Sequence, residues 1–296
     1  MDVTRVLAQS PDALANTDIA MHALSALRNS RVREIVVLGR RGVVQAAFSP
    51  PEIKEIGELA TADLVVRPEE IALDPQSESA ITEANARKNL EYLRSAAARG
   101  EGSRERKIRL RFLASPVEIL GEGRVSAIRV ERNRLVPSGT GVSAVGTGEF
   151  EVIPVGMVLR SVGYFGLRLP DVPYDERSGT IPNREGRVLD ASGNVLGRQY
   201  VVGWAKRGPS GLIGTNRSDA LATVQHMAAD QARLSLTRSD TGDIEGLLRA
   251  RGVRFTTFDD WRRLDRHEVE RGVASGKIRE KVVSIANMMA EIEASR

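Results

Sequence analysis

The chain has 296 residues, of which 41% are hydrophobic, 28% are charged and none is cysteine, and its formal net charge is +4. This composition is typical of one or two folded domains, and it excludes disulfides, zinc-thiolate sites, thiol nucleophiles and Cys-ligated iron-sulfur clusters. Aromatic residues make up only 4%, so the basic and aromatic surface of a nucleic-acid platform is missing. No stretch is long enough to span a bilayer and no leader precedes an apolar run, so we expect a cytoplasmic protein without a membrane span or nucleic-acid partner.

The first third of the chain alternates helices with strands. Apolar spacing predicts helices over residues 1–8, 18–27 and 83–98, and β-branched runs predict strands over 34–39 and 63–66. A further helix begins after Ser49-Pro50-Pro51-Glu52, which supplies an N-cap, prolines in the first turn and an early acidic charge. This alternation indicates an α/β fold with a partial, doubly wound nucleotide-binding domain.

From residue 107 the pattern changes to short strands separated by Gly, Ser and Pro turns. These predicted strands cover residues 108–113, 117–120, 125–132 and 149–155. We expect them to form an antiparallel β insertion within the nucleotide domain.

A second domain is expected to begin near Arg160. The apolar run 157–164 predicts a crossover strand, 199–204 a further strand, and 216–234 a long helix. The remainder, 241–296, has a helical pattern whose segment 256–261 resembles a capped helix start. The predicted domains are therefore 1–159 and 160–296.

The first candidate site is Gly39-Arg40-Arg41-Gly42, at the carboxyl end of the strand 34–39. In dinucleotide-binding domains this strand end approaches the adenosine ribose, where an acidic side chain selects NAD and arginine accommodates the 2'-phosphate of NADP. Two arginines therefore favour NADP. The alternative is that both are solvated residues of a surface turn.

The second candidate site is the segment 204–216, which reads as a strand end, a glycine-rich loop and a helix start around Trp204. Glycines allow close backbone approach, and the free N–H groups of a helix start favour an anion or an electron-rich ring. A cofactor loop fits this pattern, and so does an ordinary glycine-rich connection.

A glycine-rich phosphate loop is missing where a dinucleotide fold would need it, about one strand before Gly39. A formal match occurs at residues 139–144, but no helix follows it, so we interpret it as a turn. His22, His226 and His267 show no spacing typical of a metal site, and we expect no metal.

Several segments together carry a family resemblance: residues 1–7, 16–20, 36–42, 45–48, 111–119, 160–164, 178–183 and above all 201–216 (VVGWAKRGPSGLIGTN). They resemble ferredoxin-NADP reductases of the adrenodoxin-reductase type, over nearly the whole chain. The resemblance implies an incomplete NADP-binding domain over 1–159, followed by the C-terminal part of an FAD-binding domain with a helical tail over 160–296.

The resemblance also implies cofactors and site residues. Arg40 and Arg41 would bind the 2'-phosphate of NADP, with Glu52 at the same nucleotide site. The residues implied for FAD are Trp204, Gly211, Leu212 and Ile213. Glu55 lies one helical turn beyond Glu52 and is a candidate catalytic residue, although a solvated carboxylate is an equal alternative.

The implied activity is that of a flavin-dependent oxidoreductase that passes electrons between NADPH and ferredoxin, an acidic electron-transfer protein. The flavin would accept a hydride and release electrons singly, so no side-chain nucleophile is needed. The alternative is a non-catalytic remnant that binds a nucleotide or a partner protein, since both glycine-rich fingerprints of the family precede the part of it that this chain resembles.

Overall fold

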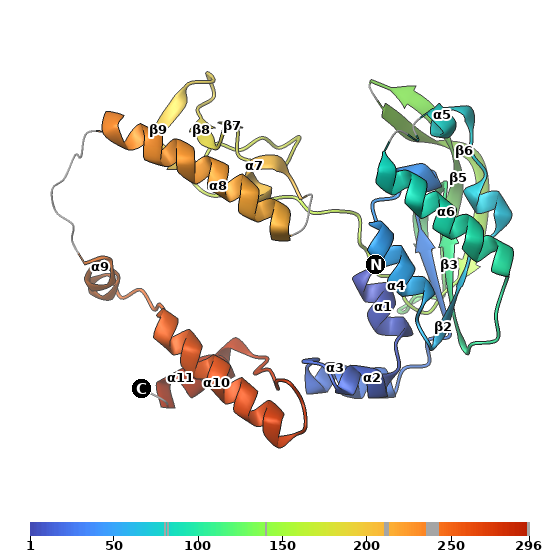
Figure 1. The fold of residues 1–296 in the computed structure, drawn as a ribbon, viewed down its shortest axis with the longest axis horizontal. Coiled ribbons are helices and arrows are strands. Elements are labelled where there is room, and N and C mark those ends of the chain that lie inside the picture. The colour runs from blue at the N-terminus through green and yellow to red at the C-terminus, as the bar shows by residue number, and fades with distance from the viewer. Residues whose placement is uncertain (80, 82, 140, 210–212, 235–242, 295–296) are drawn as a thin grey trace. The chain divides into compact units, whose positions relative to one another are not determined.

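The computed structural model describes residues 1–79, 81, 83–139, 141–209, 213–234 and 243–294 (Figure 1). The chain forms two compact units, Met1–Val158 together with Phe255–Arg296, and Leu159–Arg254. The first unit thus consists of two stretches of the chain, and the second unit lies between them in the sequence. Both units combine helices with sheets, which confirms the α/β class.

A parallel sheet forms the centre of the first unit. Its strands are β1 (Glu34–Leu38), β2 (Ala62–Val65) and β3 (Arg106–Arg111), in the order β1-β3-β2. The strands predicted over 34–39 and 63–66 are confirmed. The assignment of residues 108–113 to the antiparallel insertion is wrong, because β3 lies between β1 and β2 and runs parallel to both.

The two faces of β3 differ in chemistry. Ile108 and Leu110 are buried in the hydrophobic core, at 0% and 2% exposure. The intervening side chains point to the other face and pair with carboxylates: Lys107 with Asp63 at 2.7 Å, Arg109 with Glu34 and Glu101 at 3.0 Å, and Arg111 with Glu70 at 2.7 Å. This alternation resembles a half-exposed antiparallel strand, which explains the wrong assignment.

Helices bury the apolar face of the parallel sheet. The helices that contribute to this core are α1 (Asp2–Ala8), α4 (Pro50–Gly57) and α6 (Ala84–Arg99). The predicted start of α4 is confirmed, since Ser49 and Glu52 form a capping box. The helix predicted over 83–98 is confirmed as α6, which ends before Gly100 at φ 70°. The helix predicted over 18–27 begins later, as α3 (Met21–Arg28), after a short α2 (Pro11–Ala15).

An antiparallel sheet follows directly after β3. It consists of β4 (Ala114–Leu120), β5 (Ala127–Ser138) and β6 (Gly141–Pro154), in the order β4-β5-β6. The antiparallel insertion is therefore confirmed for these three strands. The formal glycine-rich match at 139–144 falls on the β5–β6 hairpin, where Gly139 has φ 56°, so its interpretation as a turn is also confirmed.

The second unit is a small antiparallel sheet with helices. The strands are β7 (Asn183–Arg184), β8 (Arg187–Leu189) and β9 (Val195–Tyr200), and the helices are α7 (Trp204–Arg207), α8 (Ile213–Asp230) and α9 (Ile244–Ala250). Arg187 on β8 binds Asp230 at the end of α8, with Nε 2.6 Å from Oδ2, and Tyr200 Oη donates to the same oxygen. These contacts hold α8 on the sheet.

Two predicted strands of the second domain are wrong. Residues 157–164 form no regular structure: Gly163 has φ 102° and Val162 is 68% exposed, so this run pairs with no strand among the described residues. The run 199–204 is a strand only to Tyr200, because Gly203 at φ 66° ends the extended chain and begins α7. The long helix predicted over 216–234 is present as α8, with an earlier start and end.

Two further helices complete the first unit, α10 (Phe258–Ala274) and α11 (Ile285–Ala294). Thr257 and Asp260 form a capping box at the start of α10, as the sequence predicted. After α10, Lys277 Nζ donates to the carbonyl of Ile19 at 2.8 Å, which ties this helical segment to the chain before α3.

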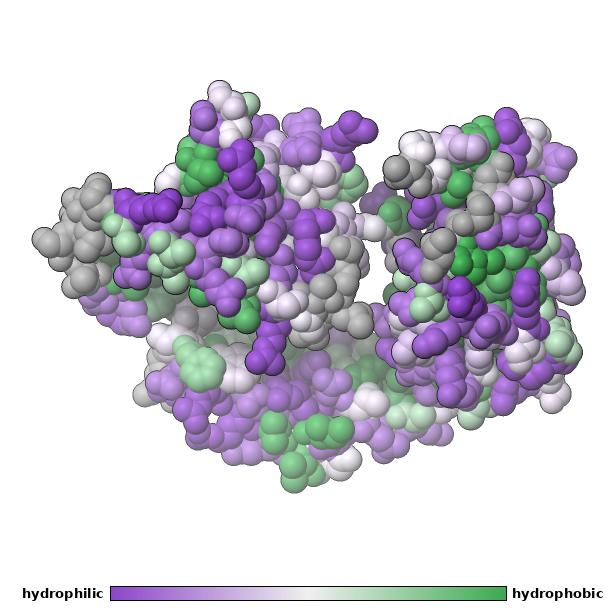
Figure 2. All heavy atoms as spheres, turned by 45° about the horizontal axis from the view of Figure 1, so that its top comes forward, coloured by the Kyte–Doolittle hydropathy of each residue, from purple (hydrophilic) through white to green (hydrophobic). Residues whose placement is uncertain are grey.

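In the face shown in Figure 2, hydrophobic residues form small groups separated by hydrophilic ones.

Candidate functional site

The loop that carries Arg40 and Arg41 is held by backbone hydrogen bonds. Gly39 N donates to the carbonyl of Arg111 at 2.8 Å, and its own carbonyl accepts from Ala114 N at 3.0 Å. The carbonyl of Arg41 accepts from Leu113 N at 3.1 Å. The junction between β3 and β4 therefore fixes the course of residues 39–41 beyond the end of β1.

Asn133 on β5 adds a side-chain link to this loop. Its Nδ2 donates to the carbonyl of Arg40 at 2.8 Å and to Ser115 Oγ at 2.7 Å, and the residue is only 4% exposed. Asn133 was not predicted as a site residue from the sequence. The available signal was a polar side chain among the inward positions of β5, between Val130 and Leu135, which are both buried.

The side chains of Arg40 and Arg41 are exposed although their backbone is fixed. Within the described part of the chain, neither guanidinium pairs with a carboxylate, in contrast to Arg109 and Arg111 on the neighbouring strand. The end of β1 therefore presents two uncompensated cations on a rigid backbone. A phosphate group is the ligand that such a pair binds best, because a guanidinium offers two charge-assisted hydrogen bonds in a fixed fork.

Glu52 and Glu55 lie on α4, the helix that follows this loop. The carboxylate of Glu52 accepts from Ser49 N and from Ser49 Oγ, both at 2.7 Å, and the backbone hydrogen bond from Ser49 lowers its pKa. Glu55 is exposed and forms an ion pair with Arg5 of α1. Glu52 is therefore occupied in holding the start of α4, and Glu55 in joining two helices.

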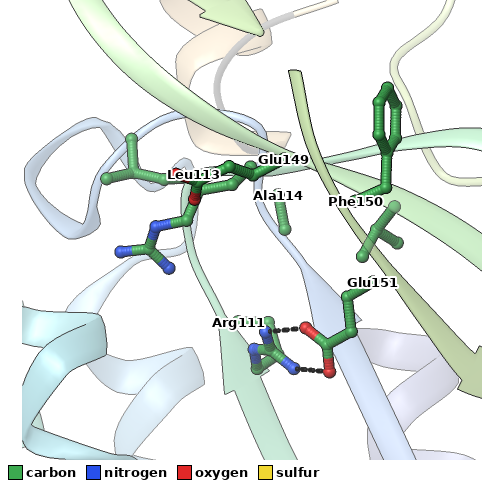
Figure 3. A pocket seen from close by; sticks show the side chains of 8 residues that line it. Arg111, Leu113, Ala114, Glu149, Phe150 and Glu151 are labelled. Atoms are coloured by element: carbon green, nitrogen blue, oxygen red, sulfur yellow. Dashed lines mark hydrogen bonds and ion pairs between the residues drawn. The ribbon is translucent and has the colours of Figure 1, made fainter. Parts of the chain in front are cut away.

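A pocket of about 180 Å³ lies where the parallel sheet meets the antiparallel sheet in the first unit (Figure 3), and residues of β3, β4, β5 and β6 line it. Arg111 donates to Glu151 from Nη2 at 2.6 Å and to Glu70 from Nε at 2.7 Å. Glu70 also accepts from Phe112 N at 2.6 Å. The hydrogen bond from Arg111 lowers the pKa of Glu151. The ion pairs of Arg111 with Glu70 and Glu151 therefore connect the two sheets beside the arginine loop.

In the second unit, the short helix α7 carries Trp204 and is fixed from two sides. Asp219 of α8 accepts from Gly203 N and from Lys206 Nζ, both at 2.8 Å. From the other side, the carbonyl of Lys206 accepts from Asn183 Nδ2 at 2.9 Å. The hydrogen bond from Lys206 lowers the pKa of Asp219. Lys206 and Asp219 were not singled out from the sequence.

The indole of Trp204 remains 45% exposed on this fixed helix. A flat, half-exposed aromatic surface fits contact with the ring of a cofactor such as FAD. Gly211 and Leu212 lie outside the described residues, and Ile213 begins α8. The predicted nucleotide residues thus lie in the first unit, whereas Trp204 and Ile213 lie in the second.

Comparison with known proteins gives one consistent family. The chain is 40% identical over 98% of its length to NADPH-ferredoxin reductase FprA of Mycobacterium tuberculosis, and 39% identical to human mitochondrial NADPH:adrenodoxin oxidoreductase, again over 98%. It covers 64% and 61% of these relatives, which is less than two thirds of their length. No protein-family model matches the chain.

A solved structure of Mycobacterium tuberculosis FprA in complex with NADPH agrees with this result. It matches 99% of the chain with a TM-score of 0.87 and 38% identity, and the chain covers 65% of it. The chain is therefore a homologue of ferredoxin-NADP reductases of the adrenodoxin-reductase type, as its residues predicted. The non-catalytic alternative is not favoured by these relatives.

The described residues contain neither a membrane-spanning helix nor a cluster of metal ligands. No helix there combines the length and the apolar character that a membrane crossing requires. In the same part of the chain, no three His, Asp or Glu side chains gather closely enough to hold a metal ion. His267 instead pairs with Glu291 at 3.0 Å.

Proposed function

We propose that this chain belongs to a flavin-dependent oxidoreductase that passes electrons between NADPH and ferredoxin. The observation that carries the proposal is the arginine loop: Arg40 and Arg41 are exposed and unpaired within the described residues, on a backbone fixed at the carboxyl end of a parallel strand. That position is where dinucleotide-binding folds select the ribose substituent. The similarity to NADPH-dependent reductases supports the same assignment.

In this proposal residues 1–159 are the NADP-binding part, a portion of a doubly wound domain. Arg40 and Arg41 hold the 2'-phosphate, and Asn133 keeps their backbone in place. Glu52 fixes the start of the helix that follows the nucleotide loop. Glu55 stays a candidate for the reaction itself, although its ion pair with Arg5 must then open.

Residues 160–296 are proposed as the C-terminal part of the FAD-binding domain, with a helical tail. When bound, FAD supplies the chemistry, since it accepts a hydride and releases electrons singly. The role of the chain is to orient the flavin: Trp204 offers a ring surface, and the Lys206–Asp219 ion pair fixes the helix that carries it. Residues 211–213 are the further contacts implied by the resemblance.

The proposed partner is an acidic ferredoxin, which a protein with a net charge of +4 attracts over a distance. Charges at the rim of such an interface change mainly the rate of association, so reduction of ferredoxin should slow as salt rises to physiological ionic strength. The proposed compartment is the cytoplasm, on the basis of composition.

The NADP site is tested by comparing the affinities of the chain for NADP and NAD. The double variant Arg40→Ala/Arg41→Ala should lose the preference for NADP, on the order of a hundredfold, because two charge-assisted contacts disappear. The matched control is Arg28→Ala/Arg31→Ala, which removes the same charge from exposed residues before β1. Equal affinity of the unchanged chain for both nucleotides would contradict the proposal.

A further inference from the structure

A second aromatic ring lies against Trp204. The ring of Tyr164 is 5.8 Å from that of Trp204 between centroids, with an angle of 30° between the planes. Both side chains are exposed, Tyr164 at 69% and Trp204 at 45%. Two stacked rings with this much free surface form an exposed aromatic platform that can accept a further aromatic ring.

The chain around Tyr164 is positioned by local contacts within the second unit. Gly163, with φ 102°, turns the backbone immediately before the tyrosine. Two residues later, Gly166 N donates to the carbonyl of Gly179 at 3.2 Å, and the carbonyl of Gly166 accepts from Tyr174 Oη at 2.6 Å. The tyrosine is therefore held beside Trp204 by its neighbours, although its segment has no regular secondary structure.

The neighbouring ring shows that exposure alone does not make this platform. Phe165 is 68% exposed, almost the same as Tyr164, but its ring lies against Gly179. Of these adjacent aromatic residues, Tyr164 is the one that stacks on the residue assigned to the flavin. Phe165 is thus a matched control for any effect of removing an exposed ring here.

We propose that Tyr164 is a further flavin-binding residue, which completes with Trp204 an aromatic wall for the isoalloxazine ring of FAD. This inference rests on the proposed function, because Trp204 contacts FAD only in that assignment. A heteroaromatic ring system is the occupant that two stacked, half-exposed rings suit, since aromatic pairs gain stabilisation beyond the area they bury. The hydroxyl of Tyr164 adds little to such a contact, so the aromatic ring carries the role.

The test is equilibrium dialysis of the full chain and its variants against FAD. Tyr164→Ala should weaken the affinity for FAD about three- to tenfold, the range expected for the loss of one aromatic contact. Tyr164→Phe should retain the affinity, and Phe165→Ala should leave it unchanged. Because both rings are exposed, all three variants should unfold at the same temperature as the unchanged chain.

A second readout reports the ring contact itself. In a Trp261→Phe background, Trp204 is the only indole, and FAD should quench its emission less in Tyr164→Ala than in Tyr164→Phe. If the unchanged chain neither binds FAD nor shows quenching, the proposed function and this inference both fail. If it binds FAD and Tyr164→Ala binds equally well or more tightly, the proposed function stands and the role of Tyr164 is refuted.

Discussion

The two candidate sites fix their functional side chains by different means. In the first unit, the arginine loop is held by neutral hydrogen bonds from backbone groups and from the amide of Asn133. In the second unit, the helix of Trp204 is held mainly by a carboxylate, which accepts from Lys206 and from Gly203 N. Both arrangements combine a rigid backbone with an exposed functional group. Neutral hydrogen bonds are insensitive to pH and salt, whereas the contacts of a carboxylate depend on its charge.

Asn133→Leu should have the largest effect on this comparison. Leucine has the same number of side-chain heavy atoms in the same branched arrangement, but it leaves the carbonyl of Arg40 and the hydroxyl of Ser115 without their donor. The free energy of unfolding should fall by about 3 kcal/mol, because two buried hydrogen bonds are lost, and the preference for NADP should fall with it. Urea unfolding measures the first effect. Asn287→Leu, at an exposed position on α11, should cost little. Unchanged stability would show that Asn133 does not fix the loop that carries Arg40 and Arg41.

Asp219→Ala should come next. It removes the acceptor of Gly203 N and the ion-pair partner of Lys206. The side chains of Asp219 and Lys206 are only 13% and 15% exposed. Loss of a charge-assisted contact of this kind costs about 2 kcal/mol. Unfolding followed by Trp204 emission in a Trp261→Phe background provides the measurement, with Glu176→Ala as control because that carboxylate is 82% exposed. A cost no greater than that of the control would mean that the ion pair does not fix α7.

Gly203→Ala should have a smaller effect of pure backbone origin. Its φ of 66° suits glycine, and the nearest atom to an added Cβ is Asn216 Oδ1 at 4.0 Å, so no clash contributes. The expected loss is about 1 to 2 kcal/mol of unfolding free energy, because φ 66° with ψ −142° is a combination that residues with a Cβ rarely adopt. Gly214→Ala, in open space on α8, should instead be neutral or stabilising. Two equal costs would show that the conformation of Gly203 is not the cause.

Acid should weaken the second unit through Asp230, and this effect is the smallest because it appears only as the pH falls below 3.8. The hydrogen bond from Arg187 lowers the pKa of Asp230 from 3.8 to about 2. A lowered pKa stabilises the folded state fully above pH 3.8, and this contribution disappears as pH falls towards 2. Asp230→Asn should therefore lower the melting temperature at pH 6 and have less effect near pH 2. A constant difference across this range would exclude the linkage.

Local signals predicted much of the fold. The capping boxes at Ser49 and Thr257 marked two helix starts, and Gly100 marked a helix end. The sheet membership of β3 was not predictable in this way, because it depends on β1 and β2, which lie far away in sequence. The run 157–164 failed for a related reason: its apolar residues suggested a strand, but no strand pairs with it among the described residues.

The residues of the candidate sites show the same difference between local signals and contacts that are distant in sequence. Arg40 and Arg41 were located from the strand that precedes them, and Trp204 from its glycine-rich segment and the family resemblance. Asn133 and Asp219 were missed because a polar residue shows its role only when its partner is known. Those partners are Arg40, which lies 93 residues before Asn133, and Gly203, which lies 16 residues before Asp219. Both missed residues support functional groups rather than carry them.

The two-faced strand β3 also determines how the parallel sheet is aligned. If β3 slipped by one residue against its neighbours, every side chain would change faces. Lys107, Arg109 and Arg111 would then enter the hydrophobic core without partners, while Ile108 and Leu110 would meet the carboxylates. The cost of burying unpaired cations far exceeds any gain from an alternative pairing. The alternating charges therefore make a misaligned strand pairing energetically unfavourable. They thus keep the end of β1, with its two arginines, at a defined position.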